Sequence, residues 1–408
     1  MTIGKKAKTR DGRTRRFEMK KAILRGPSLT QSGYGVHCRQ VASWLLSKKD
    51  WDVKFQALPW GDTPWLLNEK SNDGLIDRIM KNTVDLSDSN SNYDISFQLQ
   101  LPNEWDHKLA KYNVGMTAGI ETDICNPVWI DCCNKMDLVI VPSKHAENSL
   151  KNSGKINTPI QIVPESFCNE ILDETSTDLL KNFPTFSTNT NFLVFGQITG
   201  DNPMNDRKNI FFTIKWFCEV FKDDPDVGLV IKTNIGRNTQ IDKKKTLELM
   251  SIIVKECRKS QFPKIHIIHG DMTDKEVAAL YKHPQINGFI SLTRGEGYGL
   301  PLLEAAASGL PVIATGWSGH MDFLSRGKFI EIDHDVKKIH ASRADNKLFM
   351  PEAKWAEANE DDFKKKIVKF KNSQAKPKEW AKELELIIKE NYSQESIFKY
   401  YDKVVENI

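Results

Sequence analysis

Short apolar runs alternate with longer amphipathic segments along almost the whole chain. The runs are rich in Val, Ile, Leu and Phe and lie at 22–26, 53–58, 93–99, 112–119, 137–143, 159–165, 191–197, 227–234, 264–270, 288–293 and 311–316. Several are apolar at consecutive positions, as in "DLVIVPS" (137–143), which is typical of strands covered by helices on both faces. The pattern therefore predicts an α/β fold with parallel sheets and helical crossovers.

A polar segment, residues 172–191, divides the strands into two groups of similar size. It is rich in Ser, Thr, Asn and Asp, which is typical of a connection between domains. We predict a first domain at 22–180 and a second at 190–385. Because doubly wound sheets bind ligands at the carboxyl edge of their strands, the two edges should face each other across a cleft. Residues 386–408 have a helical pattern and are predicted to return to the first domain.

The charge of the chain is unevenly distributed. Residues 1–21 contain nine Lys or Arg and two acidic residues, whereas the whole chain has a net charge of only +4, so the remainder is mildly acidic. Such a polar, basic segment is predicted to be a disordered tail. It is either a solubilising leader or an arm that contacts nucleic acid or an anionic membrane.

Other features of the composition bear on location. No apolar run approaches the roughly 20 residues that span a bilayer, and the N-terminus has no apolar core of a secretory signal. The seven cysteines form no Cys-x-x-Cys pair, which favours reduced thiols. We predict a cytoplasmic protein without a transmembrane segment. The Lys-, Asn- and Ile-rich composition also occurs in viral proteins, in which case the location is the host cytoplasm.

The most informative segment is "RGEGYGLPLLEAAASG" (294–309), which predicts a glycine loop followed by a helix with a glycine stop. The start of such a helix binds anions such as phosphate, and glycines such as Gly297 and Gly299 let backbone amides approach a ligand. Glu296 and Glu304 would each accept hydrogen bonds from a sugar diol on either side of that anion. The alternative is a loop carboxylate and a helix-surface carboxylate without function.

This segment and its continuation "LPVIATGWSGHMDFL" resemble the signature of the retaining GT-B glycosyltransferases of family four, also called glycosyl transferases group 1. The family has a Glu-x7-Glu spacing, an "EGYG" start, a small-residue helix and a Gly turn before an acidic residue, here Asp322. The resemblance implies two Rossmann-like domains that face each other and transfer of a sugar from a nucleotide-sugar donor to a hydroxyl. Glu296 would act in catalysis. The donor would lie against Gly297, Tyr298, Gly299, Leu300 and Glu304.

The resemblance also implies a pair of cations on the donor diphosphate. Lys208 matches the family lysine, but Gln197 stands at the position of the family arginine, so Arg207 or Lys232 would supply the second charge. The alternative for Arg207 and Lys208 is an exposed helix start. Many sugar transferases hold a divalent metal on the diphosphate with an Asp-x-Asp motif, and the match in this chain is Asp224-Pro225-Asp226. It lies in an acidic turn, so we predict neither a metal nor another cofactor.

The remaining candidates carry weaker signals. Backbone near Met272 would border the nucleobase. The loop of Gly33, Tyr34 and Gly35 would approach the diphosphate or the acceptor, although a tight turn needs the same glycines. Glu121, Thr122 and Asp123 would orient an acceptor hydroxyl, unless Thr122 or Asp123 is a helix cap. His145 is predicted to be an exposed helix residue after an N-cap at Ser143.

The acceptor predicted first is a glycan or glycoconjugate hydroxyl. A hydroxylated DNA base is an alternative, given the basic tail. Two alternatives come from other classes: a nucleotide-sugar epimerase, and a nucleic-acid-binding protein with a disused sugar site.

Overall fold

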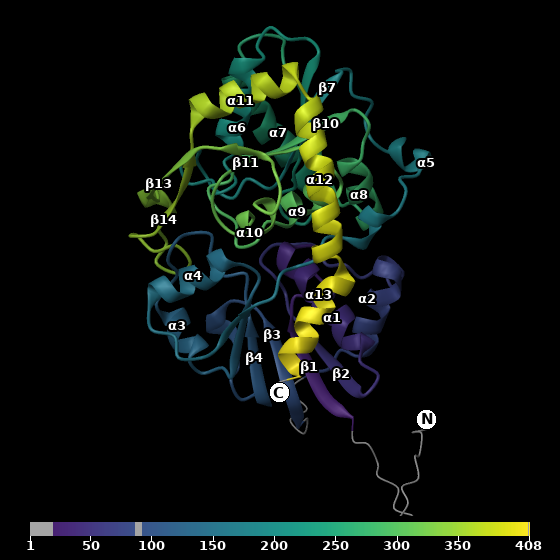
Figure 1. Ribbon diagram of the computed structural model, residues 1–408, viewed down its shortest axis with the longest axis vertical. Coiled ribbons are helices and arrows are strands. Elements are labelled where there is room, and N and C mark those ends of the chain that lie inside the picture. The colour runs from purple at the N-terminus through teal and green to yellow at the C-terminus, as the bar shows by residue number, and fades with distance from the viewer. Residues whose placement is uncertain (1–18, 86–91, 407) are drawn as a thin grey trace, which may run out of the picture.

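The computed structural model describes residues 19–85, 92–406 and 408. They form two parallel six-stranded sheets, each covered by helices, one above the other (Figure 1). The first sheet has the order β2-β1-β3-β4-β5-β6, with β1 (Lys20–Gly26), β2 (Trp51–Ala57), β3 (Tyr93–Leu99), β4 (Ala110–Met116), β5 (Leu138–Val141) and β6 (Ile160–Ile162). The second has the order β12-β11-β10-β7-β8-β9, with β7 (Thr190–Phe195), β8 (Val227–Lys232), β9 (Lys264–Ile268), β10 (Ile286–Ser291), β11 (Val312–Thr315) and β12 (Ile330–Ile332). The predicted fold class is confirmed.

Helices cross between the strands. In the first domain they are α1 (Gly33–Ser47), α2 (Ser71–Lys81), α3 (Val128–Cys133) and α4 (Lys144–Ser153), and α5 (Thr177–Leu180) lies in the connection. In the second domain they are α6 (Ile210–Val220), α7 (Gln240–Cys257), α8 (Asp274–Tyr281), α9 (Leu300–Ala307), α10 (Met321–Leu324) and α11 (Glu360–Asn372). All six residues of β8 are buried, as expected for a consecutive apolar run between two helical layers.

The chain ends in two long helices that connect the domains. α12 (Ala375–Tyr392) packs on α9 of the second domain, and α13 (Gln394–Val405) packs on α1 of the first (Figure 1). The Trp44 indole of α1 donates to Asp402 at 2.7 Å, and His37 Nε2 lies 3.1 Å from the Tyr401 hydroxyl. The predicted return of the C-terminal helices to the first domain is therefore confirmed.

The chain passes between the domains at two neighbouring places. One is the connection after β6, and the other is Ser393, which ends α12 and caps α13 with an extended ψ of 156°. The Phe167 N–H donates to the Tyr392 carbonyl at 3.3 Å, and the Asn169 side chain donates to Gln394 at 2.5 Å. The two crossings thus lie side by side.

An antiparallel hairpin was not predicted. β13 (His334–Lys338) pairs with β14 (Lys354–Ala358) beside the second sheet. β13 is almost entirely exposed and rich in charge, so it lacks the apolar run that identifies the other strands. The hairpin also touches the first domain, because the Lys354 N–H donates to the Asp123 carboxylate at 2.6 Å.

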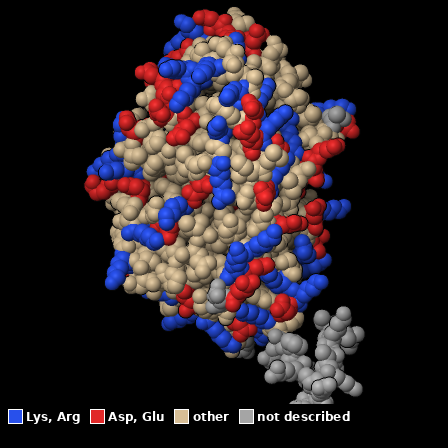
Figure 2. Space-filling model, in the orientation of Figure 1, with Lys and Arg blue, Asp and Glu red and all other residues tan. Residues whose placement is uncertain are grey.

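Most of the predicted basic tail lies outside the described residues, which begin at residue 19. Lys20 and Lys21 belong to β1, so this strand starts two residues before the predicted domain boundary. Basic and acidic side chains are interspersed over the face shown in Figure 2. Within the described ranges, no helix has both the length and the apolar character needed to cross a bilayer.

Candidate active site

The glycine loop 294–299 joins β10 to α9 where the two domains meet. Gly299 caps α9 with a φ of 106°, a left-handed conformation that favours glycine. A Cβ on Gly297 would lie 2.3 Å from the Ala118 carbonyl of the first domain, and one on Gly295 would lie 2.0 Å from the Glu121 carbonyl. These two glycines therefore allow the first domain to approach closely. The reason predicted for Gly297 was different, namely that it lets backbone amides approach a ligand.

The start of α9 leaves backbone donors free. Among the described residues, no acceptor reaches the N–H groups of Gly299 and Leu300. Tyr298 points away from this point, because its hydroxyl donates to the Glu165 carbonyl at 2.8 Å and its ring is buried. The helix start therefore offers two amides and a positive dipole end, as predicted for an anion.

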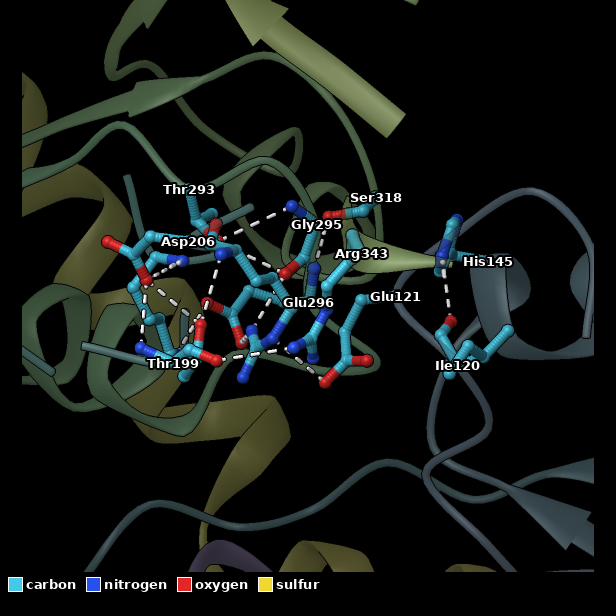
Figure 3. Close-up of polar contacts among 12 residues, drawn as sticks. Ile120, Glu121, His145, Thr199, Asp206, Thr293, Gly295, Glu296, Ser318 and Arg343 are labelled. Atoms are coloured by element: carbon cyan, nitrogen blue, oxygen red, sulfur yellow. Dashed lines mark hydrogen bonds and ion pairs between the residues drawn. The ribbon is translucent and has the colours of Figure 1, made fainter. Parts of the chain in front are cut away.

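Glu296 is the centre of a row of charges that runs from the second domain to the first (Figure 3). Its Oε1 lies 2.6 Å from Lys208 Nζ, and its Oε2 lies 3.0 Å from an Arg207 guanidinium nitrogen. Arg207 Nε in turn lies 3.1 Å from Oε1 of Glu121 in the first domain. Burial raises the pKa of Glu296, but Lys208 and Arg207 outweigh it and lower the pKa to about 2. Glu296 is therefore a carboxylate with both oxygens on cations.

Asp206 holds the loop that carries the two cations. Its Oδ1 accepts from the Thr199 N–H and hydroxyl at 2.9 Å, and its Oδ2 accepts from the Ile210 N–H at 2.8 Å, at the start of α6. The Arg207 N–H donates to the Thr199 hydroxyl at 3.0 Å. The Asp206 carboxylate is thus hydrogen-bonded to backbone donors and lies at the start of α6. These contacts fix the loop that carries Arg207 and Lys208.

Glu304 lies on α9 in a second group of carboxyls. Burial and the nearby Asp274 raise the pKa of Glu304 to about 8. Burial and Glu304 likewise raise the pKa of Glu165 to about 8. Glu165 was not predicted, since the segment after β6 has no motif that marks it. At neutral pH Glu304 is mostly protonated, so it can both donate to and accept from a diol.

The predicted glycine loop of the first domain is the first turn of α1, which Ser32 caps, and its two glycines have different surroundings. No atom lies within 4 Å of a Cβ on Gly33, whereas one on Gly35 would lie 2.1 Å from the Thr30 carbonyl. Gly35 is therefore needed for the turn, and Gly33 is the open position. The Tyr34 hydroxyl lies 3.0 Å from the Thr117 hydroxyl and accepts from the Ala118 N–H, and the ring stacks on Trp60 at 3.9 Å.

Two predicted acceptor residues have different surroundings. Glu121 joins the charge row through Arg207, whereas the Asp123 carboxylate accepts from the Lys354 N–H of β14 and links the hairpin to the first domain.

The prediction that His145 is exposed is wrong. It is half-buried, with Nε2 3.2 Å from the Ile120 carbonyl and its ring 4.8 Å from that of Trp317. Ser143 caps α4 as predicted.

The structure places Arg207, and not Lys232, beside Lys208. Lys232 Nζ donates to the Asn234 side chain at 2.8 Å and to the Gly270 carbonyl at 2.7 Å, and burial lowers its pKa to about 8. Gln197 is exposed, and Met272 is half-buried just before the N-cap of α8.

The acidic turn 224–226 precedes β8 and so lies at the amino ends of the parallel strands. The glycine loop follows β10 and lies at their carboxyl ends. Asp224 Oδ2 is 2.9 Å from Lys371 Nζ. Over the described part of the chain, no group of His, Cys, Asp and Glu side chains is arranged to hold a metal ion.

Comparison with known proteins agrees with this geometry. Residues 203–343, which include Lys208, Glu296 and Glu304, match the family model described as Glycosyl transferases group 1. No curated protein sequence matches the chain. Among solved structures, the sucrose-phosphate synthase of Thermosynechococcus elongatus is 12% identical with a TM-score of 0.62, over 95% of this chain and 98% of that one. Anabaena HepE, solved with UDP and glucose, is 11% identical with a TM-score of 0.58, over 95% of this chain and 100% of that one. The fold is therefore GT-B, and the part of the second domain that carries Lys208, Glu296 and Glu304 is similar to glycosyl transferases group 1.

Proposed function

We propose that this protein is a retaining glycosyltransferase of family four that moves a sugar from a nucleotide-diphosphate sugar to an acceptor hydroxyl. The observation that carries the proposal is the Glu296 carboxylate held between Lys208 and Arg207, directly before the free amides of α9. Glu304 follows on the same helix. This arrangement suits an anion flanked by hydroxyl groups on both sides.

Each group has a role in the proposed reaction. The diphosphate would lie against the Gly299 and Leu300 amides and Lys208, the ribose diol against Glu304, and hydroxyls of the transferred sugar against Glu296. The bond between the anomeric carbon and the phosphate oxygen breaks while the acceptor oxygen bonds to the same face. The departing phosphate takes the acceptor proton. Lys208 and the helix start stabilise the charge that develops on the phosphate, and no metal is required.

UDP-sugars are the first donors to test, because HepE, which shares the fold, was solved with UDP and glucose. A glycan or glycoconjugate is the favoured acceptor. The interspersed charges in Figure 2 give no support to a DNA acceptor, and the basic residues of 1–18 lie outside the described part of the chain. All seven cysteines are free thiols, which is consistent with a cytoplasmic location.

The test is incubation with a panel of nucleotide sugars, with and without glycans and DNA that contains hydroxylated bases. Release of nucleotide together with a new α-linked product from an α-linked donor, identified by nuclear magnetic resonance, would support the proposal. A β-linked product would contradict retention. Epimerised sugar without transfer would indicate an epimerase, and tight DNA binding without turnover would indicate a nucleic-acid-binding protein.

A further inference from the structure

Arg343 is a cation that the proposed reaction does not use. It lies in the short helical turn Ala341–Arg343, between β13 and β14, and reaches the charge row beside Glu121 and Glu296 (Figure 3). One of its nitrogens donates to the Thr199 carbonyl at 3.2 Å, while its buried Nε has no hydrogen-bond partner within the described residues. A buried donor without a partner costs free energy unless a ligand satisfies it.

Arg343 is also not in direct contact with a carboxylate of the described residues, although Glu121, Asp345 and Asp206 act on it at longer range. Among the described residues it forms no ion pair, whereas Arg207 pairs with Glu121 and Glu296, and the buried Arg294 pairs with Glu357. Asp206, which is nearby, is occupied by the backbone donors of its own loop. Within the described part of the chain, Lys208, Arg207 and Arg343 therefore have only two carboxylates in direct contact, Glu296 and Glu121, both of which pair with the other two cations.

The segment that carries Arg343 is held firmly. The Asn202 and Asn205 side chains both donate to the Ser342 hydroxyl at 3.1 Å. Asp345 Oδ1 accepts from three successive N–H groups, those of Lys347, Leu348 and Phe349. The guanidinium lies 4.0 Å from the centre of the Phe349 ring, which fixes its plane. Arg343 is thus preorganised and not a solvated surface cation.

Arg343 lies close to Glu121, the residue that ends the charge row opposite Lys208 (Figure 3). The row runs from Lys208 through Glu296 and Arg207 to Glu121. Burial lowers the pKa of Arg343, and the nearby Glu121 is the largest of the effects that raise it. A ligand group that meets Arg343 would therefore lie beyond the transferred sugar and not at the leaving phosphate.

We propose that Arg343, together with the adjacent Arg207, forms a second anion subsite that binds a carboxylate or phosphate substituent on one of the two substrates. This inference rests on the proposed glycosyltransferase function. The anion is either the carboxylate of a uronic acid donor or a charged group on the acceptor. Both sources present the planar or tetrahedral oxygens that a guanidinium binds through two parallel hydrogen bonds.

The experiment compares the parent, Arg343→Gln and Lys347→Ala, which removes an exposed cation from the same segment. In the donor arm, UDP-glucuronic acid is compared with UDP-glucose, by calorimetric binding and by transfer to a neutral glycan. In the acceptor arm, glucose 6-phosphate is compared with glucose. UDP binding is measured for every variant, because UDP occupies the nucleotide and diphosphate site and carries neither a transferred sugar nor an acceptor.

We expect the parent to prefer the charged substrate in one arm by about ten-fold or more in kcat/KM, as for a charge-assisted hydrogen bond. Arg343→Gln should abolish that preference and leave UDP affinity within about two-fold, and Lys347→Ala should change neither. No preference in either arm, or an equal loss of UDP affinity in Arg343→Gln, would overturn the subsite. A parent that binds no UDP and transfers no sugar would instead refute the proposed function.

Discussion

Replacing Glu165 by Gln should stabilise the protein in alkaline solution. Glu165 is 4% exposed, its Oε1 lies 3.7 Å from His37, and its Oε2 has no hydrogen-bond partner among the described residues. Burial, the larger effect, and the nearby Glu304 raise the pKa of Glu165 from its ordinary value of 4.5 to about 8. The folded protein therefore keeps a proton on Glu165 between these pH values while the unfolded chain releases it.

The sign and size of the effect follow from proton linkage. Because the folded pKa is raised, the stability contributed by the protonated carboxyl is complete below about pH 4.5 and is lost as the pH rises through 8. The loss is about 1.4 kcal/mol for each pH unit, or on the order of 5 kcal/mol over the whole window. A glutamine stays neutral, so Glu165→Gln should be close to the parent at pH 5 and more stable by several kcal/mol at pH 8.

The assay is urea denaturation of both proteins at each pH from 5 to 9. His37 titrates below this range in the folded state and is common to both proteins, so the difference between them reports Glu165 together with its coupling to Glu304. Glu248→Gln on the surface of α7, with a side chain 62% exposed, is the control and should show no such trend. A difference between variant and parent that stays constant from pH 5 to 8 would refute the reasoning.

Three further predictions concern the charge row and its surroundings. Lys208→Met should lower kcat/KM by about 10²–10³-fold, because it removes a cation from the developing phosphate charge; steady-state kinetics on the folded variant would check this, and a loss below ten-fold would contradict it. Glu304→Ala should weaken UDP binding about ten-fold through loss of the ribose contacts, measured by calorimetry; an unchanged Kd would remove Glu304 from the donor site. Asp123→Ala should lower the free energy of unfolding by about 1–3 kcal/mol, since the Lys354 N–H loses its charged acceptor, and should leave kcat/KM nearly unchanged. A large loss of activity with unchanged stability would instead support the predicted acceptor role of Asp123.

Eleven of the twelve parallel strands could be predicted because each carries its own signal. β8 is an apolar run buried along its whole length, and each of the eleven predicted runs overlaps a strand of one of the two sheets. The short β12 was not predicted, because it has only three residues and one of them is the exposed Glu331. β13 could not be predicted in this way, because its "HDVKK" sequence is charged and exposed and it is held by pairing with β14. A strand whose stability comes from its partner leaves little trace in its own sequence.

The residues of the candidate site also fall into two groups, those that a local motif predicts and those that only tertiary packing brings in. Glu296, Glu304 and Lys208 stand in local motifs, and the structure places Glu296 and Lys208 in direct contact. Arg343 and Glu165 come from segments without a motif, and only tertiary packing brings them near the predicted residues. Glu121 and Asp123 are two residues apart, yet one pairs with Arg207 and the other with the backbone of β14, a difference that depends on contacts far away in the sequence.

The adjacent crossings at Phe167 and Tyr392 limit how the two halves of the molecule can move. Two chain crossings that lie side by side form a natural hinge, so an opening of the two domains would turn about the line between them. Other contacts between the domains, such as that between Asp123 and β14, would have to break in such a motion. Access to the space between the domains would then depend on a few polar contacts, while the register of each sheet is preserved.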